Sequence, residues 1–353
     1  MKRLIPKHIS ILKPYQSARR IGIQGRIYLN ANESPWINNI QYKFNNLNRY
    51  PEFQPYKLLK KYSLYSGVPI NQILITRGAD EGIEIITRTF CESNIDKIMF
   101  FPPTYDMYNV IANIFNIKKI IIPILSNFQL DIKNIKKKIN NVKIIYICYP
   151  NNPTGNFFSR NKIIRIINSV SKTTLIVIDE AYIDFSIKYS FVSELNNFDN
   201  LIILRTLSKS FGLSAIRCGF VLSNVKIIKI LKKVLAPYPI SIPVSDIAIQ
   251  SLCSQNIFLM QKNILRILKN KKFLIDQLKK ISYIKNIFHS EANFILIKFA
   301  ESKTIFKYLI SKGIIVRDQS HNLGLKNCLR ISIGTIHECQ ELINVLSIYK
   351  GKI

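Results

Sequence analysis

Short β-branched apolar runs alternate along the chain with longer stretches in which apolar residues recur at helical spacing. The short runs are almost continuously apolar, which is typical of strands that are covered on both faces. Seven such runs precede residue 230: Ile73 to Thr76, Lys97 to Phe101, Lys119 to Pro123, Lys143 to Tyr149, Thr174 to Ile178, Leu201 to Arg205 and Cys218 to Leu222. We therefore expect an α/β fold, in which helices cover both faces of a mostly parallel sheet.

The pattern changes after Pro237-Tyr238-Pro239. A helical stretch from about Val244 to Ile281 leads to three further strand-like segments, which are Asn293 to Phe299, Gly313 to Arg317 and Cys328 to Ile333. This change predicts three units. Residues 46–240 form a large domain, residues 241–353 form a smaller α+β domain, and residues 1–45 form an N-terminal arm that packs on the smaller domain.

Composition narrows the class of protein. The chain has 353 residues, 48% of them hydrophobic, which predicts a packed globular protein. No apolar run approaches the roughly 20 residues that a membrane helix needs, and the charged N-terminus lacks the apolar core of a signal peptide. The six cysteines are scattered without a C-x-x-C pair, and there are four histidines. We therefore expect no disulfide framework and no metal site, and a reducing cytoplasm as the compartment.

The formal net charge of +30 raises the question of a nucleic-acid partner. The lysines are spread over the whole length together with asparagine and isoleucine, and no basic stripe interleaved with aromatic residues occurs. We interpret the charge as mainly compositional and expect no specific nucleic-acid partner. A positive field would nevertheless attract phosphorylated or dicarboxylate substrates.

Polar clusters follow several of the expected strands, where ligands bind in open parallel sheets. A helix is expected to begin within Arg77-Gly78-Ala79-Asp80-Glu81-Gly82. This segment is either a phosphate-binding site or an ordinary capped helix start. Asn151-Asn152-Pro153-Thr154-Gly155 predicts a turn that can also offer an amide to a ligand. Asp179-Glu180-Ala181-Tyr182 follows four apolar residues. It reads as a capping carboxylate, as a counter-ion for a cationic ligand, or as the Walker B motif of an ATPase.

The last cluster surrounds Lys209, which follows the Leu201 to Arg205 run. A lysine in such a loop is usually a solvated surface residue. Here Thr206, Ser208 and Ser210 flank it and Arg217 follows, a combination that suits a bound phosphate. Nearby positive charge would also lower the pKa of the lysine, as a Schiff-base amine requires.

Taken in order, the motifs RGADEG, PPTY, NNPTG, DEAY, TLSK and RCGF resemble the fold-type-I pyridoxal-phosphate-dependent aminotransferases. The fuller matches LNANE, NRYP, TRGADEG, LRTLSK and CLRIS are similar to the histidinol-phosphate aminotransferase family of that class. The resemblance runs from about residue 11 to residue 347. Each motif alone has modest specificity, whereas six or more in this order are very specific.

The resemblance implies a role for each matching residue toward pyridoxal 5'-phosphate, which the large domain would bind. Lys209 would hold the cofactor as a Schiff base and move the substrate proton. Asp179 would face the pyridine nitrogen and keep it protonated. The remaining implied contacts are Asn152 and Tyr182 to the 3′ oxygen, Tyr105 on the ring face, and Ala79, Asp80, Thr206, Ser208 and Arg217 at the phosphate.

The resemblance also implies a substrate and a partner. L-Histidinol phosphate and 2-oxoglutarate would be converted to imidazole-acetol phosphate and L-glutamate in histidine biosynthesis. Arg330 would bind the acidic end of either substrate, and Arg317, Tyr15 and Asn32 are further candidates for the substrate pocket. Tyr50 would reach the cofactor phosphate of a partner subunit, which implies a homodimer.

Three other functions stay open at this point. A nucleic-acid-dependent ATPase needs a G-x-x-x-x-G-K-[ST] loop, and the only Gly-Lys pair is Gly351-Lys352 at the C-terminus. An aromatic aminotransferase or a threonine-phosphate decarboxylase would share the fold and the proton-transfer residues. A non-catalytic binding protein descended from such an enzyme would have no need to keep Lys209, Asp179 and Arg217 together.

Overall fold

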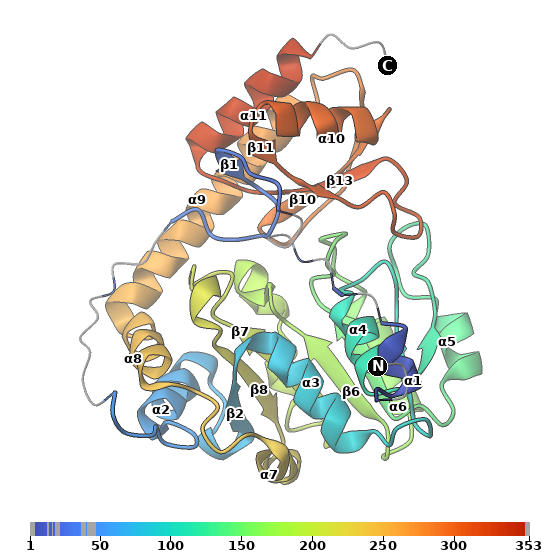
Figure 1. The fold of residues 1–353 in the computed structure, drawn as a ribbon, viewed down its shortest axis with the longest axis vertical. Helices are drawn as coiled ribbons and strands as arrows, with labels where there is room; N and C mark the ends of the chain where they lie inside the picture. The colour runs from blue at the N-terminus through green and yellow to red at the C-terminus, as the bar shows by residue number, and fades with distance from the viewer. Residues whose placement is uncertain are drawn as a thin grey trace.

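A seven-stranded sheet forms the frame of the molecule in a computed structural model, which describes residues 4–12, 14–15, 17, 22–36, 40 and 47–349 (Figure 1). Neighbouring strands run parallel, except that β8 is antiparallel to both of its neighbours, β2 and β7. The mostly parallel sheet expected from the sequence is therefore confirmed. In spatial order the strands are β2 (Ile73–Thr76), β8 (Gly219–Ser223), β7 (Leu201–Thr206), β6 (Leu175–Asp179), β5 (Ile144–Cys148), β3 (Lys97–Phe100) and β4 (Lys118–Ile121).

Helices cover both faces of this sheet, because each strand is apolar on both sides. One face packs against α2 (Tyr56–Ser66), α5 (Ile132–Lys138), α6 (Arg160–Ser169) and α8 (Ile242–Ser251). The other packs against α3 (Gly78–Phe90), α4 (Met107–Ile114) and α7 (Val225–Val234). In α3, Ile83 and Ile86 are fully buried one turn apart, and each such side chain contributes about 1.5–3 kcal/mol. Short 3₁₀ helices connect the elements: η1 (Ile70–Gln72), η2 (Ile183–Tyr189), η3 (Val192–Glu194) and η4 (Ser214–Ile216).

A second hydrophobic core lies in the C-terminal third, above the large sheet in Figure 1. Its antiparallel sheet contains, in order, β12 (Arg317–Asp318), β13 (Cys328–Ser332), β10 (Phe294–Phe299) and β9 (Ile284–Ile287). It packs against α9 (Ser254–Leu278), α10 (Ser302–Ser311) and α11 (Ile336–Ile348). Thr335 and Glu338 start α11 with a reciprocal capping box. Within the described ranges, no helix combines the length and the apolarity needed to cross a membrane.

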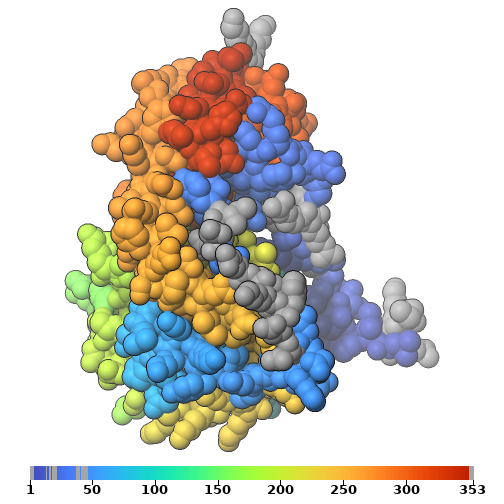
Figure 2. All heavy atoms as spheres, turned by 90° about the vertical axis from the view of Figure 1, so that its left-hand side faces the viewer, coloured from blue at the N-terminus to red at the C-terminus, as the bar shows by residue number. Residues whose placement is uncertain are grey.

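The N-terminal segment contacts both parts of the molecule. β1 (Ile27–Tyr28) pairs in parallel with β11 (Ile314–Ile315), and Figure 2 shows this segment in blue against the red C-terminal part. The side chain of Arg26 adds an ion pair to Glu341 in α11. In contrast, α1 (Lys7–Ser10) packs against α4 at the large sheet. The arm expected on the small domain therefore divides between the two parts, and the division into three units stays a prediction.

Two expected elements differ from those observed. The helical stretch from Val244 to Ile281 is two helices, because Cys253 has an extended backbone and caps the start of α9. The expected strand from Gly313 to Arg317 is two short strands with different partners. Residues 314–315 pair with β1, whereas residues 317–318 pair with β13, so the chain changes neighbour at buried Val316.

Candidate active site

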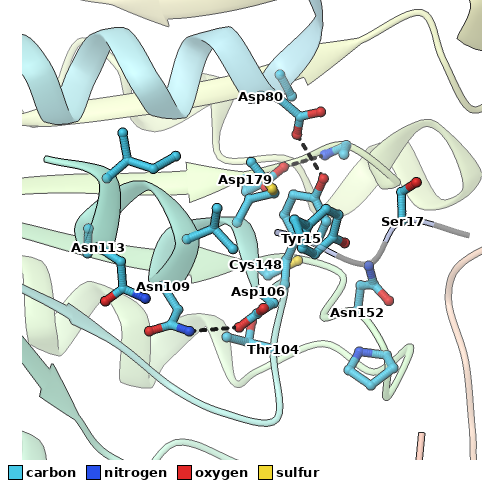
Figure 3. A pocket seen from close by; sticks show the side chains of 18 of the residues that line it. Tyr15, Ser17, Asp80, Thr104, Asp106, Asn109, Asn113, Cys148, Asn152 and Asp179 are labelled. Carbon is cyan, nitrogen blue, oxygen red and sulfur yellow. Dashed lines mark hydrogen bonds between the residues drawn. The ribbon is translucent and has the colours of Figure 1, made fainter. Parts of the chain in front are cut away.

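The carboxyl ends of β5, β6 and β7 open into a pocket of about 1550 Å³, part of which Figure 3 shows. Parallel neighbours end at the same edge, so residues far apart in sequence meet there. Thirteen of the fifteen site residues expected from the sequence line this pocket. They are Tyr15, Ala79, Asp80, Tyr105, Asn152, Asp179, Tyr182, Thr206, Ser208, Lys209, Arg217, Arg317 and Arg330.

One end of the pocket is built to receive an anion. Helix α3 begins at Gly78, so its first N–H groups, including those of Ala79 and Asp80, have no partner within the helix. Arg217, in the left-handed conformation at φ 53°, donates to Ser208 Oγ at 3.2 Å. The hydroxyl of Thr206 donates to the same oxygen at 2.9 Å. Backbone N–H groups, two hydroxyls and a guanidinium thus surround one position.

Glycines make this arrangement possible. Gly78 has φ 76°, and a Cβ there would lie 2.5 Å from Arg217 Nη2. A Cβ on Gly219 would lie 2.5 Å from the carbonyl carbon of Gly78. Any larger residue at either position would push Arg217 or the start of α3 away.

Lys209 lies deeper in the pocket, where its Nζ donates to the carbonyl oxygen of Ala31 at 3.1 Å. Burial, and after it the nearby positive charge of Arg330, lower the pKa of its amine to about 8. Neutral amine is therefore available close to neutral pH, as a nucleophile or a base requires.

Asp179, at the end of β6, is 2% exposed and keeps two donors. The hydroxyl of Tyr108 donates to Oδ2 at 2.8 Å, and the N–H of Ala181 donates to Oδ1 at 3.1 Å. Burial raises the pKa of this carboxyl to about 6, although both hydrogen bonds act to lower it. An anion held in an apolar site has a strong preference for a cationic neighbour.

A hydrogen bond from Asn32, behind the pocket wall, fixes Tyr182. Asn32 Nδ2 donates to the hydroxyl of Tyr182 at 3.0 Å. Asn32 itself is 1% exposed and is not among the residues that line the pocket. Its left-handed backbone and its contacts with Ser332 hold it behind Tyr182, and its role at the substrate stays a prediction.

Arg330, on β13, faces the pocket from the second core. Its Nη1 donates to Asn152 Oδ1 at 2.6 Å and its Nη2 to the carbonyl oxygen of Asn30 at 2.8 Å. Its buried Nε has no hydrogen-bond partner among the described residues. Arg317 is near in space, because it is the residue paired with Arg330 across β12 and β13. Burial, and to a smaller extent the positive charge of Arg317, lower the pKa of Arg330. Two guanidinium groups at this end favour an anionic ligand.

Tyr105 and Tyr15 are two aromatic residues of the pocket lining. The hydroxyl of Tyr105 donates to Asp80 Oδ1 at 2.8 Å, so its ring is fixed beside the start of α3. Burial raises the pKa of the Tyr15 hydroxyl, and charged side chains of both signs lie near it. Figure 3 draws Tyr15 with Asn152 and Asp179 among the side chains that line the pocket. Both tyrosines were expected at a ligand, and both line the pocket.

Tyr50 is the second expected residue that is not among those lining the pocket. It is 78% exposed and stacks on Tyr238 with ring centroids 4.3 Å apart. This position leaves its ring open to a neighbouring molecule.

Sequence reasoning missed Tyr108 and the carbonyl groups of Asn30 and Ala31. Tyr108 follows Tyr105 by three residues, and its ring stacks on Tyr146 in the core at 4.8 Å. The repeated tyrosine in TYDMY was a signal for a second ring at this wall. No comparable signal existed for Asn30 and Ala31, since a backbone carbonyl can belong to any residue.

Comparisons with known proteins agree with this geometry. The family model for aminotransferase class I and II matches residues 28–346. The histidinol-phosphate aminotransferase of Buchnera aphidicola subsp. Schlechtendalia chinensis is 50% identical over 348 residues, which cover 98% of this chain and 97% of that protein.

Solved structures show the same fold. The histidinol-phosphate aminotransferase of Clostridium acetobutylicum has a TM-score of 0.83 at 27% identity, over 91% of this chain and 98% of that one. The histidinol-phosphate aminotransferase of Sinorhizobium meliloti, solved in complex with pyridoxal-5'-phosphate, has a TM-score of 0.82 at 19% identity, over 97% of each chain.

Proposed function

The chain belongs to the aminotransferase class I and II family, and we propose on that premise that it exchanges an amino group between L-histidinol phosphate and 2-oxoglutarate. The products are imidazole-acetol phosphate and L-glutamate, in histidine biosynthesis. The observation that carries this proposal is the 50% identity to a histidinol-phosphate aminotransferase over nearly the full length of both chains. The pocket supports it, since cationic groups lie at two ends and an amine and a carboxylate lie between them.

We propose pyridoxal 5'-phosphate as the cofactor, because the residues fit each of its parts. The N–H groups at the start of α3, the hydroxyls of Thr206 and Ser208, and Arg217 would bind its phosphate. Gly78 and Gly219 keep that space open. Asp179, Asn152, Tyr182 and Tyr105 would surround its ring, and Lys209 would bond it covalently.

When bound, the cofactor supplies an aldehyde that bonds amines and a ring that withdraws electrons from the substrate carbon. The amine of Lys209 would hold the cofactor and, once free of it, would take the proton from the amine-bearing carbon of the substrate. A pKa of about 8 leaves a useful neutral fraction for this step. Asp179 is mostly ionised above about pH 6, so it would hold a proton on the ring nitrogen of the cofactor. Tyr108 keeps that carboxylate in one orientation.

The two substrates share an anionic end, and we propose that Arg330 binds it in both half-reactions. The Nε of Arg330 lacks a partner among the described residues, and its two Nη atoms are held by neutral oxygens that an anion can replace. Arg317 and Tyr15 border the same space and would add contacts to the phosphate of histidinol phosphate.

We also propose a homodimer in a reducing cytoplasm. Tyr50 and Tyr238 form an exposed aromatic stack outside the pocket, which suits contact with a second copy of the chain. Tyr50 would then reach the cofactor phosphate of the partner subunit. All six cysteines are free, which supports a reducing compartment.

An absorbance spectrum of the purified protein tests this proposal. We expect a visible band with pyridoxal phosphate, which bleaches when histidinol phosphate is added and returns with 2-oxoglutarate. A band that ignores histidinol phosphate but releases carbon dioxide from threonine phosphate would replace the substrate with that of the decarboxylase. Failure of the protein to form any band with pyridoxal phosphate would refute the cofactor and the function together.

A further inference from the structure

A buried charge cluster lies behind the pocket, on the other face of the large sheet. Arg205 and Thr206 are consecutive residues of β7, so their side chains point to opposite faces. Thr206 lines the pocket, whereas Arg205 points away from it and its side chain is 5% exposed. Arg205 is therefore not a ligand of anything in the pocket, and its burial needs another explanation.

Arg205 lies on the strand that leads to Lys209, and its partners come from the segment that follows Asp179. Its Nε donates to Glu180 Oε2 at 2.8 Å, and Glu180 directly follows Asp179. Its Nη1 lies 3.4 Å from Asp184 Oδ1. The hydroxyl of Ser210 donates to the other oxygen of Asp184, and Ser210 directly follows Lys209.

Further hydrogen bonds complete the cluster. Glu180 accepts from the N–H of Phe191 at 2.5 Å and from the hydroxyl of Ser190 at 3.0 Å. Asp184 also accepts from the hydroxyl of Tyr65, in α2, at 3.0 Å. The two carboxylates are thus saturated with donors, and each is held in one orientation.

Stability alone is a poor explanation for such a cluster. Burying two carboxylates and a guanidinium carries a desolvation cost, and a well-packed apolar cluster of similar volume is commonly as stable or more so. The surrounding core of the large domain is already rich in isoleucine and phenylalanine. What charged groups add over apolar ones is direction, since each hydrogen bond fixes the angle as well as the distance between its partners.

We propose that Arg205, with Glu180 and Asp184, is a positioning device that holds the loop of Lys209 in register with Asp179. The chain of contacts runs from Asp179 through Glu180, Arg205, Asp184 and Ser210 to Lys209. This role rests on the proposed function and extends it to residues that never touch the cofactor or the substrate. Small displacements of a reacting group lower turnover steeply.

Two variants, each of which loses one hydroxyl group, separate a positioning role from a purely stabilising one. Ser210→Ala removes the donor to Asp184 that belongs to the Lys209 loop. Tyr65→Phe removes a different hydroxyl donor to the same carboxylate and leaves the loop attached. Each loses one hydroxyl and keeps the ion pair of Arg205 with Glu180, so we expect both proteins to fold.

The decisive readout is the pKa of the Lys209 amine in the cofactor-free protein. It is measured from the pH dependence of acetylation by acetic anhydride, followed at the Lys209 peptide by mass spectrometry. Burial lowers this pKa to about 8 in the native position. A loosened loop exposes the amine, so in Ser210→Ala we expect a rise of about half a pH unit or more toward the ordinary value of lysine. We expect no rise in Tyr65→Phe.

Turnover gives the second readout. We expect kcat to fall about tenfold in Ser210→Ala with KM little changed, and to stay near wild type in Tyr65→Phe. Equal lysine pKa values in the two variants and wild type, with only the thermal midpoint lowered, would overturn the positioning role. The acetylation measurement needs no cofactor, so it tests the inference even if the proposed function fails, and the wild-type spectrum tests that function separately.

Discussion

Asp179→Asn should make the cofactor-free protein more stable while it makes the enzyme slower. The carboxyl of Asp179 is 2% exposed, and burial raises its pKa from an ordinary 3.8 to about 6. The folded state therefore binds this proton more tightly than the unfolded chain does. Ionised Asp179 thus opposes folding above pH 6, and the penalty disappears below about pH 4.

The size of the effect follows from these two pKa values. They differ by about two pH units, each worth 1.36 kcal/mol, so the full penalty is about 3 kcal/mol. At pH 5 roughly half of it remains. Asparagine keeps the shape, accepts from the N–H of Ala181 and can meet the hydroxyl of Tyr108, so it avoids the penalty without leaving a cavity.

Urea unfolding of the cofactor-free wild type and variant, at pH 8 and at pH 5, measures the effect. We expect a gain in the free energy of unfolding at pH 8 that shrinks by about half at pH 5. Pyridoxal phosphate should narrow the gain, since only the carboxylate pairs with a protonated ring, and kcat should fall strongly. A gain that is equal at both pH values, or a variant that is less stable at pH 8, would refute the reasoning.

Three further substitutions test other parts of the pocket. Lys209→Ala should abolish the visible cofactor band and transamination, as read by spectroscopy and by glutamate release. Arg330→Ala should raise KM for both histidinol phosphate and 2-oxoglutarate by about 100-fold, since a buried ionic contact is worth about 3 kcal/mol. Gly78→Ala should weaken pyridoxal phosphate binding at least tenfold in titrations, because the new Cβ would lie 2.5 Å from Arg217 Nη2.

Controls and contrary outcomes are specific to each substitution. Gly67→Ala is the match for Gly78→Ala, since Gly67 has φ 73° but no atom within 4 Å of the new Cβ, and it should lose stability without losing cofactor affinity. Equal pyridoxal phosphate affinity in the Gly78→Ala and Gly67→Ala variants would show that the start of α3 does not bind the cofactor phosphate. Normal turnover by Lys209→Ala would end the covalent role of that amine. An effect of Arg330→Ala on one substrate only would exclude a shared anion site.

The strands of the large sheet and the pocket at their ends could be predicted because both depend on local patterns. Continuous β-branched runs mark doubly covered strands, and a polar residue directly after such a run, as with Asp179, marks the ligand edge. Element ends were less predictable. β4 begins one residue and ends two residues earlier than expected. It lies at the edge of the sheet, where Lys118 and Lys119 are exposed, and these polar residues made the start of the strand hard to recognise in the sequence.

What could not be predicted depends on long-range packing. Asn32 belongs behind Tyr182 only because β1 pairs with β11, nearly 290 residues away in sequence. Arg205 sits inside an apolar run, and its partners became visible only when β6, β7 and η2 came together. Tyr50 faces away from its own pocket, and only the family resemblance suggested that it has a role there.

The pairing of β1 with β11 has a consequence for the order in which the molecule matures. The segment that supplies the Ala31 carbonyl to Lys209 is synthesised nearly 290 residues before its strand partner. Closing so long a loop is entropically costly and slow. The phosphate end of the pocket, built from α3 and β7, can form earlier in synthesis, whereas the wall beside Lys209 must wait until residues 314–315 have been made. Cofactor capture could therefore precede catalytic competence in the life of each molecule.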